Sequence, residues 1–146
     1  ALRQPRDRTI RYADLRPAMA EEGVIRLLLL DGALAEKCRD LAPESFSSPF
    51  LGRIYSLLLE AWEEGRTMSA ASLAGECGPE EMSHLTGILQ KPEAPARADR
   101  ALADYIQVIQ ASAAKRLGLT EADPLQAAVE KFKGDKKKKG NGGKQS

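Results

Sequence analysis

The chain has 146 residues, of which 42% are hydrophobic and 29% are charged, a balance that suits one globular domain with an appendage. The longest apolar run, residues 27–30, is far too short to cross a bilayer, so no membrane partner is expected. The net charge of +1 is uneven: residues 1–16 carry five Arg and two Asp (+3), residues 134–146 carry five Lys and one Asp (+4), and −6 is left for the part between them. An acidic body argues against a nucleic-acid-binding core, since phosphate contacts need clustered Lys and Arg, and leaves at most weak nucleic-acid contact through the basic ends.

Residues 1–17 show no apolar periodicity and are expected to be a flexible linker from a preceding domain. The chain starts with Ala1 instead of methionine, which fits a piece of a longer protein. Pro17 is expected just ahead of the first helix, a position that proline favours. That helix is predicted over residues 18–30, with a wide apolar face and with Glu21, Glu22 and Arg26 on its outer side.

The most clearly marked helix is predicted over residues 49–64. Ser48 can cap it, Pro49 fills its first position, where no backbone N–H is needed, and Gly65 can end it. Because this helix is apolar over most of its circumference, we expect it at the centre of the bundle, with Phe50 and Trp62 in the core.

The remaining helices are shorter or more polar. They are predicted over residues 33–39, 69–73, 78–89, 96–117 and 123–133. Residues 134–146 are rich in lysine and glycine and are expected to be a disordered Lys-rich tail. No segment alternates with a period of two, so the sequence predicts an all-α, multi-helix bundle of about seven helices.

The helices are expected to form two parts. Residues 18–95 are predicted to make a helical bundle, and residues 96–133 a hairpin-like pair of one long helix and one short C-terminal helix. Nine side chains share the helical phase expected of the core: Val24, Leu28, Leu34, Phe46, Ile54, Leu58, Leu85, Ile88 and Tyr105.

No pattern in the chain points to catalysis. His84, the only histidine, has neither a nucleophile nor zinc-spaced companions in the sequence and is interpreted as a surface or boundary residue. Cys38 and Cys77 fit neither metal nor disulfide spacing and are interpreted as buried free thiols in a reducing cytoplasm. We therefore expect no catalytic residue, no cofactor and no metal ligand, and an interaction module that works through apolar side chains on helix faces.

Several segments resemble one known family. They are AEEGVIRLLLLDGALAEKC (residues 20–38), LAPESFSSPFLGRIYSLLLEAWEEG (41–65), LAGECGPEEMSHLTGILQKP (73–92), ALADYIQVI (101–109) and DPLQAAVEKFK (123–133). In this order and spacing they are similar to the C-terminal helicase-binding domain of bacterial replicative DNA primase. The resemblance covers about residues 18–133 and rests on the whole pattern instead of one short signature.

The resemblance implies a non-catalytic protein-interaction domain in the bacterial cytoplasm, at the replication fork. Such a domain docks as a monomer on the hexameric replicative DNA helicase, recruits primer synthesis and modulates the helicase. The DNA-directed RNA polymerase activity of a primase would belong to other domains. Helicase contact is expected in the terminal region, on Tyr105, Ile109, Leu125, Val129 and Phe132. The chain is short after Gly118, so the second arm of the family's helical hairpin would have only some ten residues.

Other interpretations stay open. The N-terminal domain of the replicative helicase resembles this pattern too, although a helix at residues 123–133 that runs into a lysine-rich end favours primase. A nucleic-acid-binding accessory domain that acts through its basic ends would bind DNA with a steep salt dependence. A helical enzyme fragment whose active site is completed by another domain would show nucleotidyl transfer.

Overall fold

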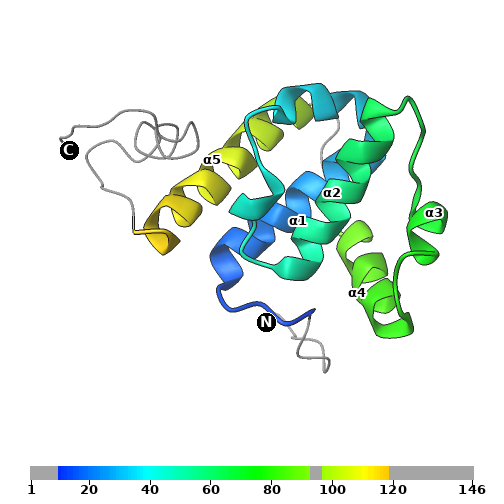
Figure 1. Ribbon diagram of the computed structural model, residues 1–146, viewed down its shortest axis with the longest axis horizontal. Helices are drawn as coiled ribbons and strands as arrows, with labels where there is room; N and C mark the ends of the chain where they lie inside the picture. The colour runs from blue at the N-terminus through cyan, green and yellow to red at the C-terminus, as the bar shows by residue number, and fades with distance from the viewer. Residues whose placement is uncertain (1–9, 93–96, 119–146) are drawn as a thin grey trace. The chain divides into compact units, whose positions relative to one another are not determined.

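The computed structural model describes residues 10–92 and 97–118, and over these residues the chain is helical without any strand (Figure 1). The all-α class predicted from the sequence is confirmed for this part of the chain. The elements are α1 (Leu15–Leu30), η2 (Gly32–Cys38), η3 (Pro43–Ser45), α2 (Pro49–Glu63), α3 (Ala70–Ala74), α4 (Pro79–Leu89) and α5 (Ala98–Arg116), where η denotes a 3-10 helix. The chain divides into two units, residues 1–109 and 110–146. Among the described helices, none combines the length and the apolar character that a membrane span needs.

Helix α1 begins three residues before the predicted start. Asp14 caps it by accepting a hydrogen bond from the Arg16 N–H at 3.2 Å, and Pro17 lies inside the first turn, where a missing N–H costs nothing. The predicted linker is therefore wrong for residues 10–17. Ile10 is fully buried in the core, which fixes this segment against the helices.

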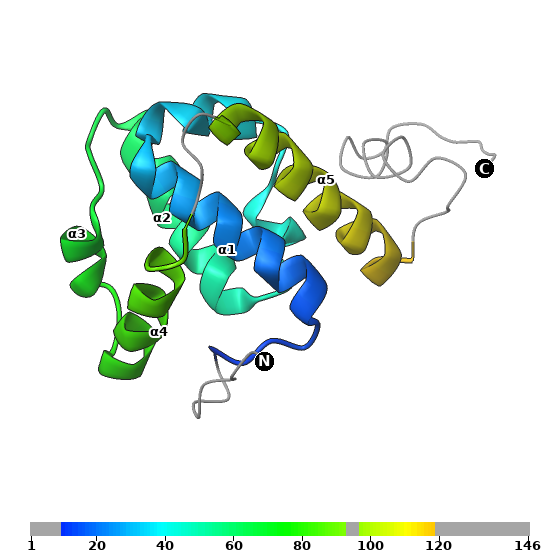
Figure 2. The ribbon, with the colours of Figure 1, turned by 180° about the vertical axis from the view of Figure 1, so that it is seen from behind.

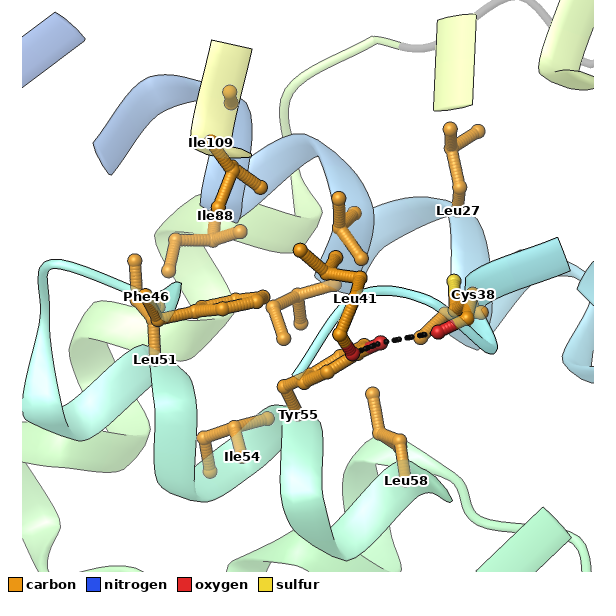
Figure 3. Packing of buried hydrophobic residues seen from close by; sticks show 14 of the residues in the cluster. Leu27, Cys38, Leu41, Phe46, Leu51, Ile54, Tyr55, Leu58, Ile88 and Ile109 are labelled. Atoms are coloured by element: carbon orange, nitrogen blue, oxygen red, sulfur yellow. Dashed lines mark hydrogen bonds between the residues drawn. The ribbon is translucent and has the colours of Figure 1, made fainter. Parts of the chain in front are cut away.

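Helix α2 has the ends that its sequence predicts. The Ser48 hydroxyl accepts from the Leu51 N–H at 3.1 Å, Pro49 is the first residue, and Gly65 adopts a φ of 74° just after the helix. The helix packs against α1, η2 and η3, so the expectation of a central position is met. In Figure 3 its Tyr55 points into the core, and the hydroxyl donates to the Leu41 carbonyl at 2.7 Å.

The later helices also lie where the sequence predicts them. Ser69 caps α3, and Gly118, with a φ of 75°, follows α5. The predicted helix at residues 33–39 is the 3-10 helix η2, with Leu34 and Cys38 buried as expected. The predicted helix at residues 123–133 and the Lys-rich tail lie outside the described residues.

The core of the first unit draws side chains from α1, η2, α2, α3, α4 and the part of α5 up to Ile109. Its fully buried large side chains include Ile25, Leu27, Leu51, Ile54, Tyr55, Leu73, Leu85, Ile88, Leu102 and Ile109. Figure 3 labels Leu27, Leu51, Ile54, Tyr55, Ile88 and Ile109 among them. Of the nine predicted core residues, eight are buried, and Tyr105 is half-buried against the same cluster. Trp62 departs from its prediction, because 36% of its surface is exposed, whereas Phe50 is buried.

Tyr105 of α5 lies directly on the backbone of α1. A Cβ atom added to Gly23 would meet the ring carbons of Tyr105, with the shortest distance at 2.3 Å, which no real contact allows. The absence of a side chain at Gly23 is therefore what lets the tyrosine ring approach the helix this closely.

We predict that Gly23→Ala lowers the free energy of unfolding by about 1–3 kcal/mol, because the new methyl group overpacks this contact. Gly87→Ala is the matched control, since Gly87 is also helical but a Cβ there meets nothing within 4 Å. It should stabilise α4 by roughly 0.5–1 kcal/mol. Urea denaturation measures both changes. If Gly23→Ala is equally destabilising in a Tyr105→Ala background, the contact with Tyr105 is not the cause.

Candidate functional site

Two adjacent carboxylates, Glu21 and Glu22, lie in the middle of α1. Their exposed fractions are 0% and 2%, and within the described residues they are the buried charged side chains. The expectation that they face outward is wrong. A buried carboxylate is costly unless hydrogen bonds or opposite charges compensate it, so the partners of these two side chains matter. Adjacent helix positions are about 100° apart, and the two carboxylates accordingly reach different neighbours.

Glu21 holds the segment that leads into α2. One carboxylate oxygen accepts from the Ser47 N–H at 2.7 Å and from the Ser47 hydroxyl at 2.8 Å, and the other accepts from the Ser48 N–H at 3.2 Å. Hydrogen bonds to an ionised acceptor are roughly twice as strong as neutral ones. Because Ser48 in turn caps α2, Glu21 fixes the point where α2 starts relative to α1.

Glu22 connects α1 to the N-terminal segment and to the region of α4. Its Oε2 accepts from the Tyr12 hydroxyl at 2.6 Å, and its Oε1 lies 2.8 Å from the Lys91 ammonium. The Tyr12 oxygen is also 2.6 Å from Nε2 of His84 on α4. The single phenol proton goes to Glu22, so His84 Nε2 carries a hydrogen and donates it to Tyr12.

The protonation of this network follows from its burial. Burial raises the pKa of the Tyr12 phenol, and the hydrogen bond to Glu22 raises it further, so the hydroxyl stays a donor. Burial lowers the pKa of His84, which the charge of Glu22 opposes and that of Lys91 reinforces. His84 is therefore neutral near pH 7. In this chain of bonds each group fixes the orientation of its neighbour, which is a structural role.

His84 itself lies between aromatic rings. Its ring centroid is 5.4 Å from that of Tyr12 and 5.8 Å from that of Phe50 on α2. The interpretation of His84 as a boundary residue agrees with its half-buried position, but its role in the network was not predicted. Among the described residues, no group of three His, Cys, Asp or Glu side chains is placed to hold a metal ion.

Of the five predicted partner-binding residues, the structure describes Tyr105 and Ile109. Ile109 is fully buried in the core, and in this conformation its side chain offers no surface to a partner. Tyr105 is half-buried on Gly23. Leu125, Val129 and Phe132 lie outside the described residues, so their part in binding stays a prediction.

Sequence reasoning missed the buried polar network. A signal was present: the residues on either side of the two glutamates, from Pro17 to Ile25, are almost all apolar or small, which leaves α1 no polar face there. Tyr12 and Lys91 carried no such signal, because each stands alone in an aperiodic segment.

Comparisons with models of protein families, with curated proteins and with solved structures find no match to this chain.

We predict that His84 makes stability depend on pH. Its pKa in the folded chain lies below the ordinary value of 6.5, so folding favours the neutral ring. The stabilisation that the neutral His84 ring gives the folded chain is complete above about pH 6.5, and it is lost as the pH falls from there through the folded-state pKa. The free energy of unfolding of the wild type relative to His84→Gln should decrease between about pH 7.5 and about pH 5.5. The reason is that the unfolded wild type binds a proton at His84 more readily than the folded chain does, whereas glutamine binds none. Urea denaturation at both pH values measures the difference, in which the carboxylates common to both proteins cancel. A difference that is constant or grows on acidification would contradict the prediction.

Proposed function

We propose that this chain is a non-catalytic interaction domain of a bacterial replicative DNA primase that docks on the hexameric replicative helicase. Docking would recruit primer synthesis to the replication fork and modulate the helicase. The observation that carries the proposal is the order and spacing of five segments that resemble this domain along residues 20–133. No single segment is specific alone, and their succession is what supports the assignment.

The packing of the first four segments supports treating them as one domain. The segment at residues 20–38 contributes Leu28 to the core, that at 41–65 contributes Ile54, that at 73–92 contributes Leu85, and that at 101–109 contributes Ile109. All four side chains belong to one cluster. The segments that carry the resemblance therefore fold together. A chance similarity of unrelated helices would not require them to share one core.

The proposed contact with the helicase lies beyond Ile109. Because the Ile109 side chain is buried, α5 would support the contact surface from inside the domain instead of touching the partner there. At the end of α5, Leu117 exposes 52% of its surface, so apolar surface is present directly before the predicted helix at residues 123–133. Leu125, Val129 and Phe132 are the side chains proposed to bind the helicase, since a few large apolar anchors carry much of the energy of an interface.

Binding to the cognate hexameric helicase tests the function. We expect a saturable complex by isothermal titration calorimetry, and no primer synthesis by this chain alone. Absence of binding at concentrations up to about 100 μM, a limit near −5.5 kcal/mol, would overturn the proposal. Saturable binding to an isolated primase, but not to the helicase, would instead identify a helicase N-terminal domain.

We predict that Val129→Ala combined with Phe132→Ala weakens helicase binding about tenfold or more, or about 1.4 kcal/mol. The helical content and melting temperature should stay close to those of the wild type. Leu30→Ala is the matched control, since it also truncates an apolar side chain, 60% exposed, at the end of α1. It should leave the affinity unchanged. Removal of residues 135–146 should have only a modest effect at physiological salt, because exposed charges are screened. Wild-type affinity of the double variant would show that the contact lies elsewhere.

A further inference from the structure

Glu22 is connected to α4 by more than one route. Among the described residues, three polar connections run from its carboxylate: through Tyr12 to His84, through Arg26 to the Ile88 carbonyl, and directly to Lys91 just after α4. Arg26 lies 3.9 Å from the carboxylate and donates to the Ile88 carbonyl at 3.4 Å. One charge therefore orients side chains that hold both the middle and the end of α4.

The other attachments of the α3–α4 region are mainly apolar: Met68, Cys77, Met82 and Leu89 are partly buried against the core, and the His84 ring lies 5.8 Å from that of Phe50 on α2. Leu73, Leu85 and Ile88 are buried, which gives the region an apolar anchor. The Arg53–Glu81 ion pair joins it to α2 at 2.9 Å, but both side chains are partly exposed, and such pairs stabilise by about 0–1 kcal/mol. Residues 62–67, which lead from α2 to α3, are exposed throughout.

Helices α3 and α4 also lie at the edge of the first unit. Helix α3 packs on α4, and α4 packs on α1, so α3 reaches the rest of the domain largely through α4 (Figure 2). A peripheral element with an exposed connection can open at lower free energy than the whole fold. A charge that holds such an element through several side chains controls its opening more strongly than any exposed pair.

We propose that residues 66–91, which include α3 and α4, open from the domain as one cooperative unit, and that the Glu22 carboxylate controls this opening. Tyr12 links the segment before α1 to α4, because its hydroxyl bridges Glu22 and His84. Opening uncovers the inner face of α4, with Leu85 and Ile88, and the side of α1 that it covers. The Glu22 charge therefore determines how often the apolar side chains beneath α4 become exposed to solvent.

Hydrogen–deuterium exchange on the full chain at pH 7 tests the proposal with a matched pair of variants. Glu22→Gln removes the charge that holds α4, whereas Glu21→Gln removes the adjacent buried charge, which holds the entry to α2. For Glu22→Gln we expect exchange of the α4 amides to rise about tenfold or more, with the amides of α2 changed by less than about twofold. For Glu21→Gln we expect the larger rise at residues 47–52, with α4 close to the wild type.

Tyr12→Phe supplies a second, milder variant, because it removes only the hydroxyl that bridges Glu22 and His84. It should accelerate exchange in α4 selectively and by a smaller factor than Glu22→Gln, and it decides the matter if the glutamine variant fails to fold. Uniform acceleration over α1, α2 and α4 would overturn the proposal. So would unchanged exchange in α4, or an equal response of α4 to Glu21→Gln and Glu22→Gln.

Discussion

The need to compensate two adjacent buried charges in α1 determines how the elements around that helix are arranged. An uncompensated carboxylate in the interior would cost more than most single interactions in the domain contribute. Glu21 is compensated by two backbone N–H groups and a hydroxyl at the entry to α2. Glu22 is compensated by the Tyr12 hydroxyl before α1, by Arg26 one turn further along α1 and by Lys91 just after α4. These hydrogen bonds and ion pairs therefore favour the arrangement in which the entry to α2 and the end of α4 lie against α1.

The apolar core and the polar network have different roles in the fold. The core, with Leu28, Ile54, Leu85 and Ile109, holds the helices together through apolar burial. The polar network lies beside it, with Glu22 buried, Tyr12 and His84 half-buried and Lys91 partly exposed, and connects the N-terminal segment, α1 and α4.

The parts of the fold that local chemistry determines could be predicted from the sequence. Ser48, Pro49 and Gly65 mark the ends of α2 through capping and backbone freedom, and the apolar period identifies most of the core. The start of α1 lies before the predicted one, because Asp14 is the cap and Pro17 is tolerated inside the first turn as well as just ahead of it. Tyr12, Glu21 and Glu22 could not be assigned, since their partners are 10 to 72 positions away and only the folded chain brings them together. Of the predicted contact residues, Ile109 has the periodicity of a core side chain, and periodicity does not distinguish a face against the bundle from a face against a partner.

A double-mutant cycle tests most directly whether the two carboxylates serve different neighbours. The free energy of unfolding is measured by urea denaturation for Glu22→Gln, Tyr12→Phe and their combination, and in parallel for Glu21→Gln with the same Tyr12→Phe. A divided arrangement predicts a coupling free energy of about 1 kcal/mol between Glu22 and Tyr12, and additivity within about 0.5 kcal/mol for Glu21 and Tyr12. Equal coupling of both glutamates to Tyr12, or none for either, would contradict it.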